Sequence, residues 1–280
     1  NYVENLGSAQ CKSSIMFAAL NTPGLTKINA KKSRNHTELL FKFLKIPITI
    51  KSKKNYDLIE VKGLSQFNRF DYYIPGDISS SAFFIVLTLL AKNSKIIIKR
   101  VNVNDSRIGI IKILNKMNSK IIFKNKKIYN GEKIADIHVK SKKNLIAIDC
   151  PSSLNSAAID EFLVIFLIAA KAKGISKFKN LGELNKKESP RLDLAVKFLK
   201  MIGIKIKKNK DNIKIYGNPN LELNGNYKIK NFLKDHRVFM MSCVAATTFG
   251  GKWKIFDRDS INTSFPKFLT ILKYLGANIN

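Results

Sequence analysis

The residues with the clearest capacity for chemistry lie between Gly182 and Leu192, in the order Gly-Glu-Leu-Asn-Lys-Lys-Glu-Ser-Pro-Arg-Leu. Here the carboxylate of Glu188 stands between Lys187 and Arg191, where apolar residues begin to recur with helical period. The amino end of a helix carries unpaired N–H groups and partial positive charge, so it suits phosphate or carboxylate. Glu188 can therefore act as an acid or base on an anionic substrate. The alternative is an ordinary solvated first turn.

A second carboxylate, Asp160, stands at the edge of the apolar segment 162–165. Partial removal from water raises the pKa of a carboxyl group, so we expect the pKa of Asp160 to approach that of a working base. Other polar residues at predicted helix starts, such as Ser79, Ser106 and Ser264, are interpreted as ordinary N-caps.

The formal net charge of +30 would normally indicate a nucleic acid or an anionic membrane surface as partner. Only seven of the 50 basic residues are arginine, however, and the lysines are scattered among Asn and Ile. No basic run is interleaved with aromatic residues, as in proteins that bind single strands. A nucleic-acid-binding protein stays an alternative that predicts cations on one face and a steep salt dependence of binding.

The cysteine and histidine spacings do not predict a metal site. The three cysteines share no CxxC spacing and the three histidines lie far apart, which favours a reduced, cytoplasmic protein. The apolar runs 82–91 and 162–170 are shorter than the ~20 residues needed to cross a bilayer and are interpreted as buried helices. Because the chain starts at Asn1 without Met, we expect it to be part of something longer.

The elements that must position these side chains recur as one α/β unit of helix, strand, helix, strand and strand. Its copies are spaced by about 70 to 80 residues, which is too long for a solenoid repeat. Each first helix is apolar nearly all round, so we expect these helices at the centre and the sheets outside. The predicted first helices are 8–20, 79–91, 156–172 and 235–249.

Several motifs, in this order along the chain, resemble those of the 5-enolpyruvylshikimate-3-phosphate synthase family. They are Ser8-Ala9-Gln10, Leu20-Asn21-Thr22-Pro23-Gly24, Ile74-Pro75-Gly76-Asp77-Ile78-Ser79-Ser80, Ile159-Asp160-Glu161, residues 184–192, Asp235-His236-Arg237 and Ser264-Phe265-Pro266. The resemblance implies an α/β enolpyruvyl transferase fold, with repeated subdomains, buried helices and outer sheets in two lobes. It implies that residues 1–75 are the C-terminal part of an incomplete first lobe, and that residues 76–280 are most of the three subdomains of the second.

The family resembled here transfers the enolpyruvyl group of phosphoenolpyruvate to the 5-hydroxyl of shikimate 3-phosphate and releases phosphate, without metal or cofactor. The resemblance implies this step of aromatic amino acid biosynthesis, in a cytoplasmic monomer with small-molecule substrates and no nucleic-acid or membrane partner. The hydroxyl loses a proton while the enol carbon gains one, so the reaction needs a base and an acid.

Site residues follow from the resemblance motif by motif. Asp160 is the implied base, and Glu188, beside Lys187, is the implied proton donor or relay. The residues implied to bind shikimate 3-phosphate are Ser8, Ala9 through its backbone, Gln10, Arg34, Asp160 and Lys187, and those implied to bind phosphoenolpyruvate are Gln10, Arg191 and Arg237.

Three departures from the family pattern matter. Pro190 replaces the usual Asp, so we expect the following helix to survive but to lose a capping carboxylate. Thr263 stands where some branches have a lysine for phosphoenolpyruvate. The family's opening section, with a Lys-Ser pair and a glycine-containing loop, is absent, so we expect this chain alone to be inactive.

Three alternatives remain open. One is the sister enolpyruvyl transferase that acts on UDP-N-acetylglucosamine, the second is the basic nucleic-acid-binding protein, and the third is a truncated remnant without activity. The combination of Lys187-Glu188-Ser189 with Asp235-His236-Arg237 favours the shikimate enzyme over its sister.

Overall fold

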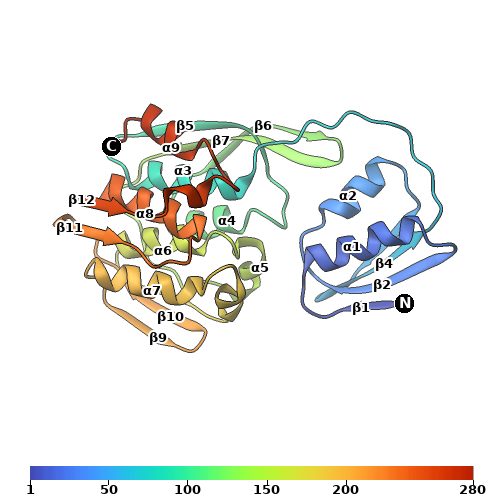
Figure 1. The fold of residues 1–280 in the computed structure, drawn as a ribbon, viewed down its shortest axis with the longest axis horizontal. Helices are drawn as coiled ribbons and strands as arrows, with labels where there is room; N and C mark the ends of the chain where they lie inside the picture. The colour runs from blue at the N-terminus through green and yellow to red at the C-terminus, as the bar shows by residue number, and fades with distance from the viewer. Residues whose placement is uncertain (280) are drawn as a thin grey trace.

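The computed structural model describes residues 1–279 as two lobes joined by an extended segment, residues 63–77, which we call the linker (Figure 1). The predicted division between residues 75 and 76 falls in this linker and stays a prediction. The first lobe consists of β1 (Tyr2–Glu4), α1 (Ala9–Leu20), β2 (Leu25–Lys31), α2 (His36–Phe43), β3 (Ile48–Ser52) and β4 (Tyr56–Lys62).

The strands of the first lobe form one sheet in the order β1-β2-β4-β3. β1 is parallel to β2, and the other pairs are antiparallel. Strand β4 alternates between exposed and buried side chains, and its inward residues Ile59 and Val61 pack with Met16 of α1 in a small separate core.

The second lobe contains three further copies of the unit. The first has α3 (Ile78–Leu90), β5 (Lys95–Asn102), α4 (Gly109–Lys116), β6 (Ile122–Tyr129) and β7 (Glu132–Lys140). The second has η1 (Ser152–Leu154), α5 (Asn155–Ala158), α6 (Phe162–Lys171), β8 (Ile175–Phe178), η2 (Gly182–Lys186), α7 (Arg191–Met201), β9 (Ile206–Asn209) and β10 (Asn212–Tyr216). The third has β11 (Leu223–Ile229), α8 (His236–Phe249), β12 (Gly250–Ile255), η3 (Arg258–Ile261) and α9 (Phe268–Tyr274).

Helices α3, α6 and α8 contact one another at the centre of the second lobe, with the sheets around them (Figure 1). Every residue of α6 from Phe162 to Ala170 is buried. Each large apolar side chain in such a position contributes roughly 1.5–3 kcal/mol to folding. The predicted arrangement of central helices and outer sheets is confirmed for α3, α6 and α8. For α1 the predicted burial on every side is wrong, because only Lys12, Met16 and Ala19 of this helix are buried.

Each copy starts with one more element than the sequence pattern predicted, namely an extended segment parallel to the strand that follows the first helix. In two copies this segment is a strand, so that β1 pairs with β2 and β11 with β12. In the other two the pairing is reduced to isolated bridges, Gly76 to Val101 in one copy, and Ile146 to Lys173 and Asp149 to Lys177 in the other. These segments are short, or their apolar and polar residues follow no regular order. They therefore lack the alternation of apolar and polar residues that identifies a strand in a sequence.

The predicted helix 156–172 is wrong as a single element. It is divided into α5 and α6 by a turn at residues 159–161, which contains Asp160 and Glu161. Their carboxylates accept hydrogen bonds from side chains of other elements, Asp160 from Arg34 and Glu161 from Ser79. The break therefore presents Asp160 where an unbroken helix would have buried it among apolar residues.

Three copies close in the same way, because the second residue after the last strand donates its N–H to a backbone oxygen at the end of the first helix. Glycine precedes that donor in two of them. A Cβ at Gly63 would lie 1.6 Å from the oxygen of Thr22, and a Cβ at Gly217 would lie 2.0 Å from the oxygen of Ala172. The N–H of Leu64 donates to the oxygen of Leu20 at 2.8 Å. In the other two copies, Lys142 donates to Leu89 at 3.1 Å and Asn218 donates to Ala170 at 2.8 Å.

Lysines occupy several strands that lie at the edges of their sheets. β6 borders the sheet β5-β7-β6 and carries Lys124, Lys126 and Lys127; β9 borders β8-β10-β9 and carries Lys207 and Lys208.

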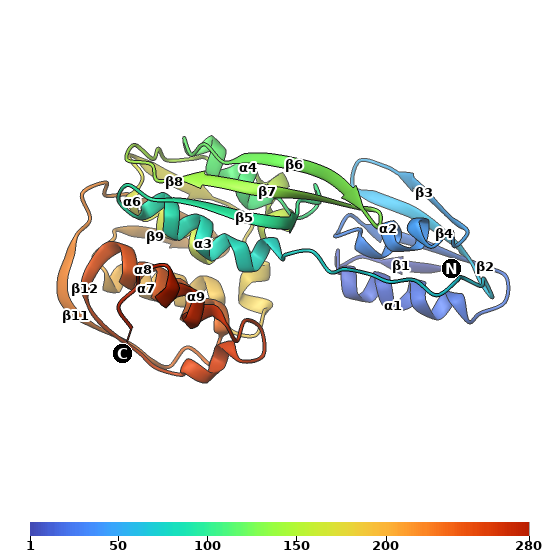
Figure 2. The ribbon, with the colours of Figure 1, turned by 90° about the horizontal axis from the view of Figure 1, so that it is seen from above.

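The hairpin of β6 and β7 reaches from the second lobe to α2 of the first (Figure 2). At its tip, Tyr129 packs edge to face on Tyr73 of the linker, with ring centroids 6.2 Å apart. In residues 1–279 no helix combines the length and the apolar character that a membrane crossing requires.

Candidate functional site

A cleft of about 1110 Å³ lies between the two lobes. The first lobe contributes the loops before α1 and α2, and the second contributes the turn between α5 and α6, the region from η2 to α7, and the start of α8. The predicted site residues that line it are Ser8, Ala9, Gln10, Arg34, Asp160, Lys187, Glu188 and Arg237. Arg191 is buried, with 1% of its side chain exposed, and reaches Asp160 from beneath the surface.

Asp160 is surrounded by four cations that come from both lobes. Arg34 of the first lobe forms a direct ion pair with Oδ2. In the second lobe, Arg191 lies 3.6 Å from Oδ1, Lys187 lies 4.0 Å from Oδ1, and Arg237 lies 4.0 Å from Oδ2. Arg237 also donates to the backbone oxygen of Asp160 at 3.1 Å. Asp160 is therefore a point at which cations of both lobes meet.

This cationic surrounding overturns the expectation that the pKa of Asp160 is raised. Burial alone would raise it, but the charges of Arg237, Arg34 and Lys187 and the hydrogen bond from Arg34 hold the pKa of the carboxyl well below its usual range. The apolar neighbours in sequence suggested a desolvated carboxyl, whereas the neighbours in space are charged.

Arg34 is held in place by a buried lysine of α1. Lys12 donates to the backbone oxygen of Arg34 at 2.8 Å and forms an ion pair of 2.5 Å with Glu38 of α2. Only 1% of the Lys12 side chain and 3% of the Glu38 side chain are exposed. Loss of one partner of a buried ion pair strongly destabilises the folded protein. The pair of Lys12 and Glu38 is therefore held firmly, and it fixes the loop that carries Arg34.

Arg191 connects the carboxylates of the second lobe. Its Nε donates to Oδ2 of Asp235 at 2.9 Å, while Nη2 pairs with Glu188. Asp235 also caps α8, accepting from the N–H of Arg237 at 2.8 Å. Burial would raise the pKa of Asp235, but Arg191 and the hydrogen bond from Ser189 keep it below its ordinary value. Glu188 itself is 62% exposed.

Helix α7 begins at Arg191, so the helix after Pro190 survives as predicted, and Pro190 makes no side-chain cap. The missing cap is supplied by Asn185 of η2. Its Oδ1 accepts from the N–H of Leu192 at 3.0 Å and from the N–H of Asp193 at 3.3 Å. A side chain six residues before the start of the helix thus satisfies the N–H groups that a cap normally serves.

The cleft also contains polar residues that sequence reasoning did not assign. Ser33 lines it, and among the described residues its buried Oγ has no hydrogen-bond partner. Its position beside Arg34 was the available signal, but α2 starts at His36, so Ser33 does not cap that helix. The other unassigned polar residues in the lining include Ser156, Asn180, Lys186 and Lys210. Within residues 1–279, no three His, Cys, Asp or Glu side chains gather as metal ligands would.

Comparisons with known proteins agree with the motifs. The profile of the family described as EPSP synthase (3-phosphoshikimate 1-carboxyvinyltransferase) matches residues 1–272. The 3-phosphoshikimate 1-carboxyvinyltransferase of Zymomonas mobilis is 35% identical over 275 residues, which are 97% of this chain and 60% of that protein. The Staphylococcus epidermidis enzyme of the same name is 37% identical over 277 residues, 98% of this chain and 62% of that protein.

Solved structures give the same result. The EPSP synthase of Acinetobacter baumannii matches with a TM-score of 0.89 and 31% identity, over 100% of this chain and 63% of that one. The enolpyruvyl transferase NikO of Streptomyces tendae is alike in fold alone, with a TM-score of 0.72, 14% identity, and 96% and 60% of the two chains covered. The chain therefore spans about three fifths of the length of the relatives it matches.

The predicted enolpyruvyl transferase fold is confirmed by these structures, and the predicted family by the profile and the relatives. The chain belongs to the EPSP synthase family.

Proposed function

We propose that this chain provides most of an active site that transfers the enolpyruvyl group of phosphoenolpyruvate to the 5-hydroxyl of shikimate 3-phosphate and releases phosphate. The observation that supports it best is Asp160, a carboxylate among Arg34, Lys187, Arg191 and Arg237 in a cleft between two lobes. Such a site suits two small anions with a hydroxyl to deprotonate between them.

The four cations have a double role in this proposal. Without substrate, Arg34, Lys187 and Arg237 keep Asp160 ionised, because they hold its pKa below the usual range. Phosphate and carboxylate groups bound beside them would offset their charge and raise the proton affinity of Asp160. Substrate binding would thus prepare Asp160 to accept the proton of the 5-hydroxyl.

The proposed reaction has two steps. In the first, Asp160 takes the hydroxyl proton, the oxygen bonds to C2 of phosphoenolpyruvate, and C3 gains a proton from the protonated form of Glu188, giving a tetrahedral intermediate. In the second, the Glu188 carboxylate takes a proton back from C3 as the bond from C2 to the phosphate oxygen breaks, so that the enol ether forms and phosphate leaves with the proton held by Asp160. Arg191 and Arg237 stabilise the charge on the carboxylate and phosphate throughout.

Glu188 changes partners in this scheme. Its carboxylate now pairs with Arg191, the guanidinium proposed to bind phosphoenolpyruvate. Arrival of that substrate would take over the charge of Arg191 and release Glu188 toward the reacting carbon. The exposed position of Glu188 leaves room for this movement.

We also propose a cytoplasmic location for the protein. All three cysteines are free, and two of them are buried, which fits a reducing compartment. The monomeric state stays a prediction.

The test is phosphate release from phosphoenolpyruvate and shikimate 3-phosphate, measured for this chain alone and for this chain joined to the portion of a relative that it does not span. We expect release by the joined protein, loss in its Asp160→Asn and Glu188→Gln variants, and none by the chain alone. If the folded joined protein releases no phosphate, or both variants match it, the proposal is wrong.

A further inference from the structure

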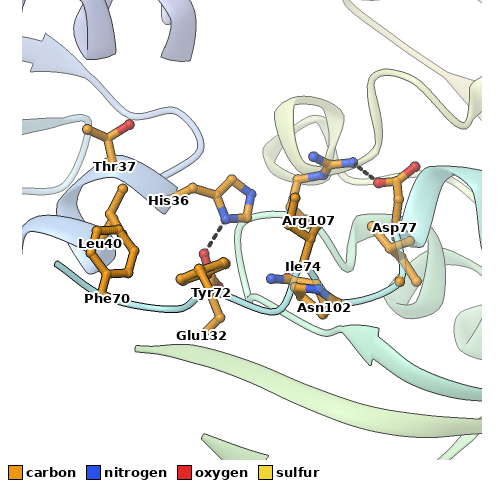
Figure 3. Close-up of a pocket in the computed structure, with 13 residues that line it drawn as sticks. His36, Thr37, Leu40, Phe70, Tyr72, Ile74, Asp77, Asn102, Arg107 and Glu132 are labelled. Atoms are coloured by element: carbon orange, nitrogen blue, oxygen red, sulfur yellow. Dashed lines mark hydrogen bonds and ion pairs between the residues drawn. The ribbon is translucent and has the colours of Figure 1, made fainter. Parts of the chain in front are cut away.

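A second pocket, of about 450 Å³, lies where α2, the linker and the second lobe meet (Figure 3). It shares no lining residue with the cleft of the candidate site. Leu40 of α2 and Phe70 and Ile74 of the linker line it, together with Arg107 and Glu132 of the second lobe. Its volume is within the range of small-molecule sites.

One side of this pocket is apolar and aromatic. Phe70 and Tyr72 pack edge to face with centroids 6.2 Å apart, and both also contact Phe43 of α2. Phe70 is 38% exposed and Ile74 is 79% exposed, so apolar surface here faces water. A flat apolar ring placed on these side chains would remove that surface from water.

The other side of the pocket carries the guanidinium of Arg107. Its Nη2 donates to Oδ1 of Asp77 at 3.0 Å and to Oγ of Ser79 at 2.7 Å. In the described part of the chain all its hydrogen bonds use Nη2, so Nε and Nη1 remain as donors. The Arg107 side chain is only 14% exposed, and a guanidinium with free donors is a natural partner for a carboxylate.

In its doubly protonated form, His36 presents a second donor to the same space. Its Nδ1 pairs with Glu132, and among residues 1–279 no partner is found for Nε2 (Figure 3). Despite burial, the hydrogen bond and charge of His36 keep the pKa of Glu132 below its ordinary value. Asp77 is neutralised likewise by Arg107. The carboxylates of Glu132 and Asp77 are thus paired with His36 and Arg107. An anion that enters the pocket would contact N–H donors and not an unpaired negative charge.

We propose that this pocket binds a small aromatic carboxylate, with its ring on Phe70 and Ile74 and its carboxylate on Arg107 and His36. Such a ligand touches α2 of the first lobe and the second lobe at once. It would therefore hold the two lobes in the arrangement seen in Figure 1.

The probe is 4-fluorobenzoate, titrated into the 280-residue chain and followed by fluorine NMR. We expect saturable binding that weakens about tenfold or more in Arg107→Gln, because hydrogen bonds to a charged group are lost. 4-Fluorobenzyl alcohol, which keeps the ring but lacks the carboxylate, is expected to bind about tenfold more weakly for the same reason.

Two further variants keep the test decisive. Arg107→Gln also removes the ion pair with Asp77, whereas Ile74→Ser changes a side chain that is 79% exposed and is expected to weaken ring binding without affecting the fold. Arg237→Gln changes a residue that lines the cleft and does not line this pocket, and it is expected to leave binding unchanged. Absence of saturable binding, binding by Arg107→Gln and Ile74→Ser as tight as by the parent chain, or loss of binding in Arg237→Gln would each overturn the proposal.

Discussion

The carboxylate of Asp235 accepts a hydrogen bond from Nε of Arg191 at 2.9 Å, and 0% and 1% of the two side chains are exposed. This pair fixes the guanidinium whose other nitrogens face Asp160 and Glu188. Asp235 thus positions a cation that is proposed to bind substrate, and the strength of the pair can be measured.

Replacing Asp235 by Asn removes a fully buried counter-ion of Arg191 and leaves the guanidinium with Asp160 and the exposed Glu188. We expect Asp235→Asn to lower the free energy of unfolding by about 3–5 kcal/mol, as for other broken buried ion pairs. Urea denaturation of the 280-residue chain measures this. The matched control is Asp259→Asn, which breaks the exposed pair with Lys234 and is expected to have no measurable effect. Equal losses in the two variants would contradict the expectation.

Glu161 gives a pH dependence of stability that can be isolated. Burial raises its pKa above the ordinary value of 4.5, despite the hydrogen bond from Ser79. The folded state therefore holds this proton more tightly than the unfolded state, and stability declines as the pH rises from about 4.5 through the higher folded-state pKa. Glu161→Gln, which keeps an acceptor for Ser79, is expected to remove this decline.

Urea denaturation at a series of pH values checks the Glu161 prediction. The variant and the parent chain are expected to have similar stability near pH 4, and the variant to be the more stable at pH 7. Parallel pH profiles for the two proteins would show that Glu161 ionises without penalty.

Asp160 opposes the binding of anions in the cleft while it is ionised. Asp160→Asn removes a negative charge near Arg34, Lys187 and Arg237, so we expect inorganic phosphate to bind the 280-residue chain about three- to tenfold more tightly. Isothermal titration measures this. Weaker phosphate binding by a folded variant would mean that Asp160 is needed to arrange the cations.

Asn185 caps α7 in place of the residue at the N-cap position. Asn185→Ala leaves the N–H groups of Leu192 and Asp193 without this acceptor, so we expect a loss of about 1 kcal/mol of stability, typical of a lost cap. Thermal unfolding measures it. Asn226→Ala, at an exposed strand position, serves as the control with little effect.

Gly217 tests the closure of the repeated unit. A Cβ there would lie 2.0 Å from the oxygen of Ala172, which is backbone, so the strand end or the helix end must move. We expect Gly217→Ala to cost about 3 kcal/mol, as overpacked sites do. In Gly76→Ala the nearest neighbour is 3.5 Å away, so this control is expected to be tolerated. Similar denaturation midpoints for both variants would contradict the steric argument.

Features that depend on residues adjacent in the chain, such as buried helices, were the ones predicted best from the sequence. The run from Phe162 to Ala170 is apolar on every side, and such a helix can only be buried, as α6 is. The motifs also predicted residues that the structure gathers in one cleft, although Arg34 and Asp160 are separated by 126 positions. Their chemical roles stay predictions.

What the sequence did not predict depends on contacts between distant segments. The pKa of Asp160 is lowered by Arg34 and Arg237, whose approach no local pattern reveals. Lys12 is hidden in a polar-looking stretch of α1, yet it is buried because Glu38 neutralises it from another helix. The capping by Asn185 requires the chain to fold back through η2, which spacing alone does not encode.

The lysines on the border strands β6 and β9 give the high net charge a physical role. An uncovered edge strand has unpaired backbone N–H and C=O groups, which can pair with the edge strand of another molecule. Such pairing leads to aggregation of soluble proteins. Lys126 and Lys207 place repelling charges along these edges, so that two copies of the protein approaching side by side are pushed apart before their backbones can pair. Colloidal stability in the crowded cell would then depend on salt, because dissolved ions weaken this repulsion.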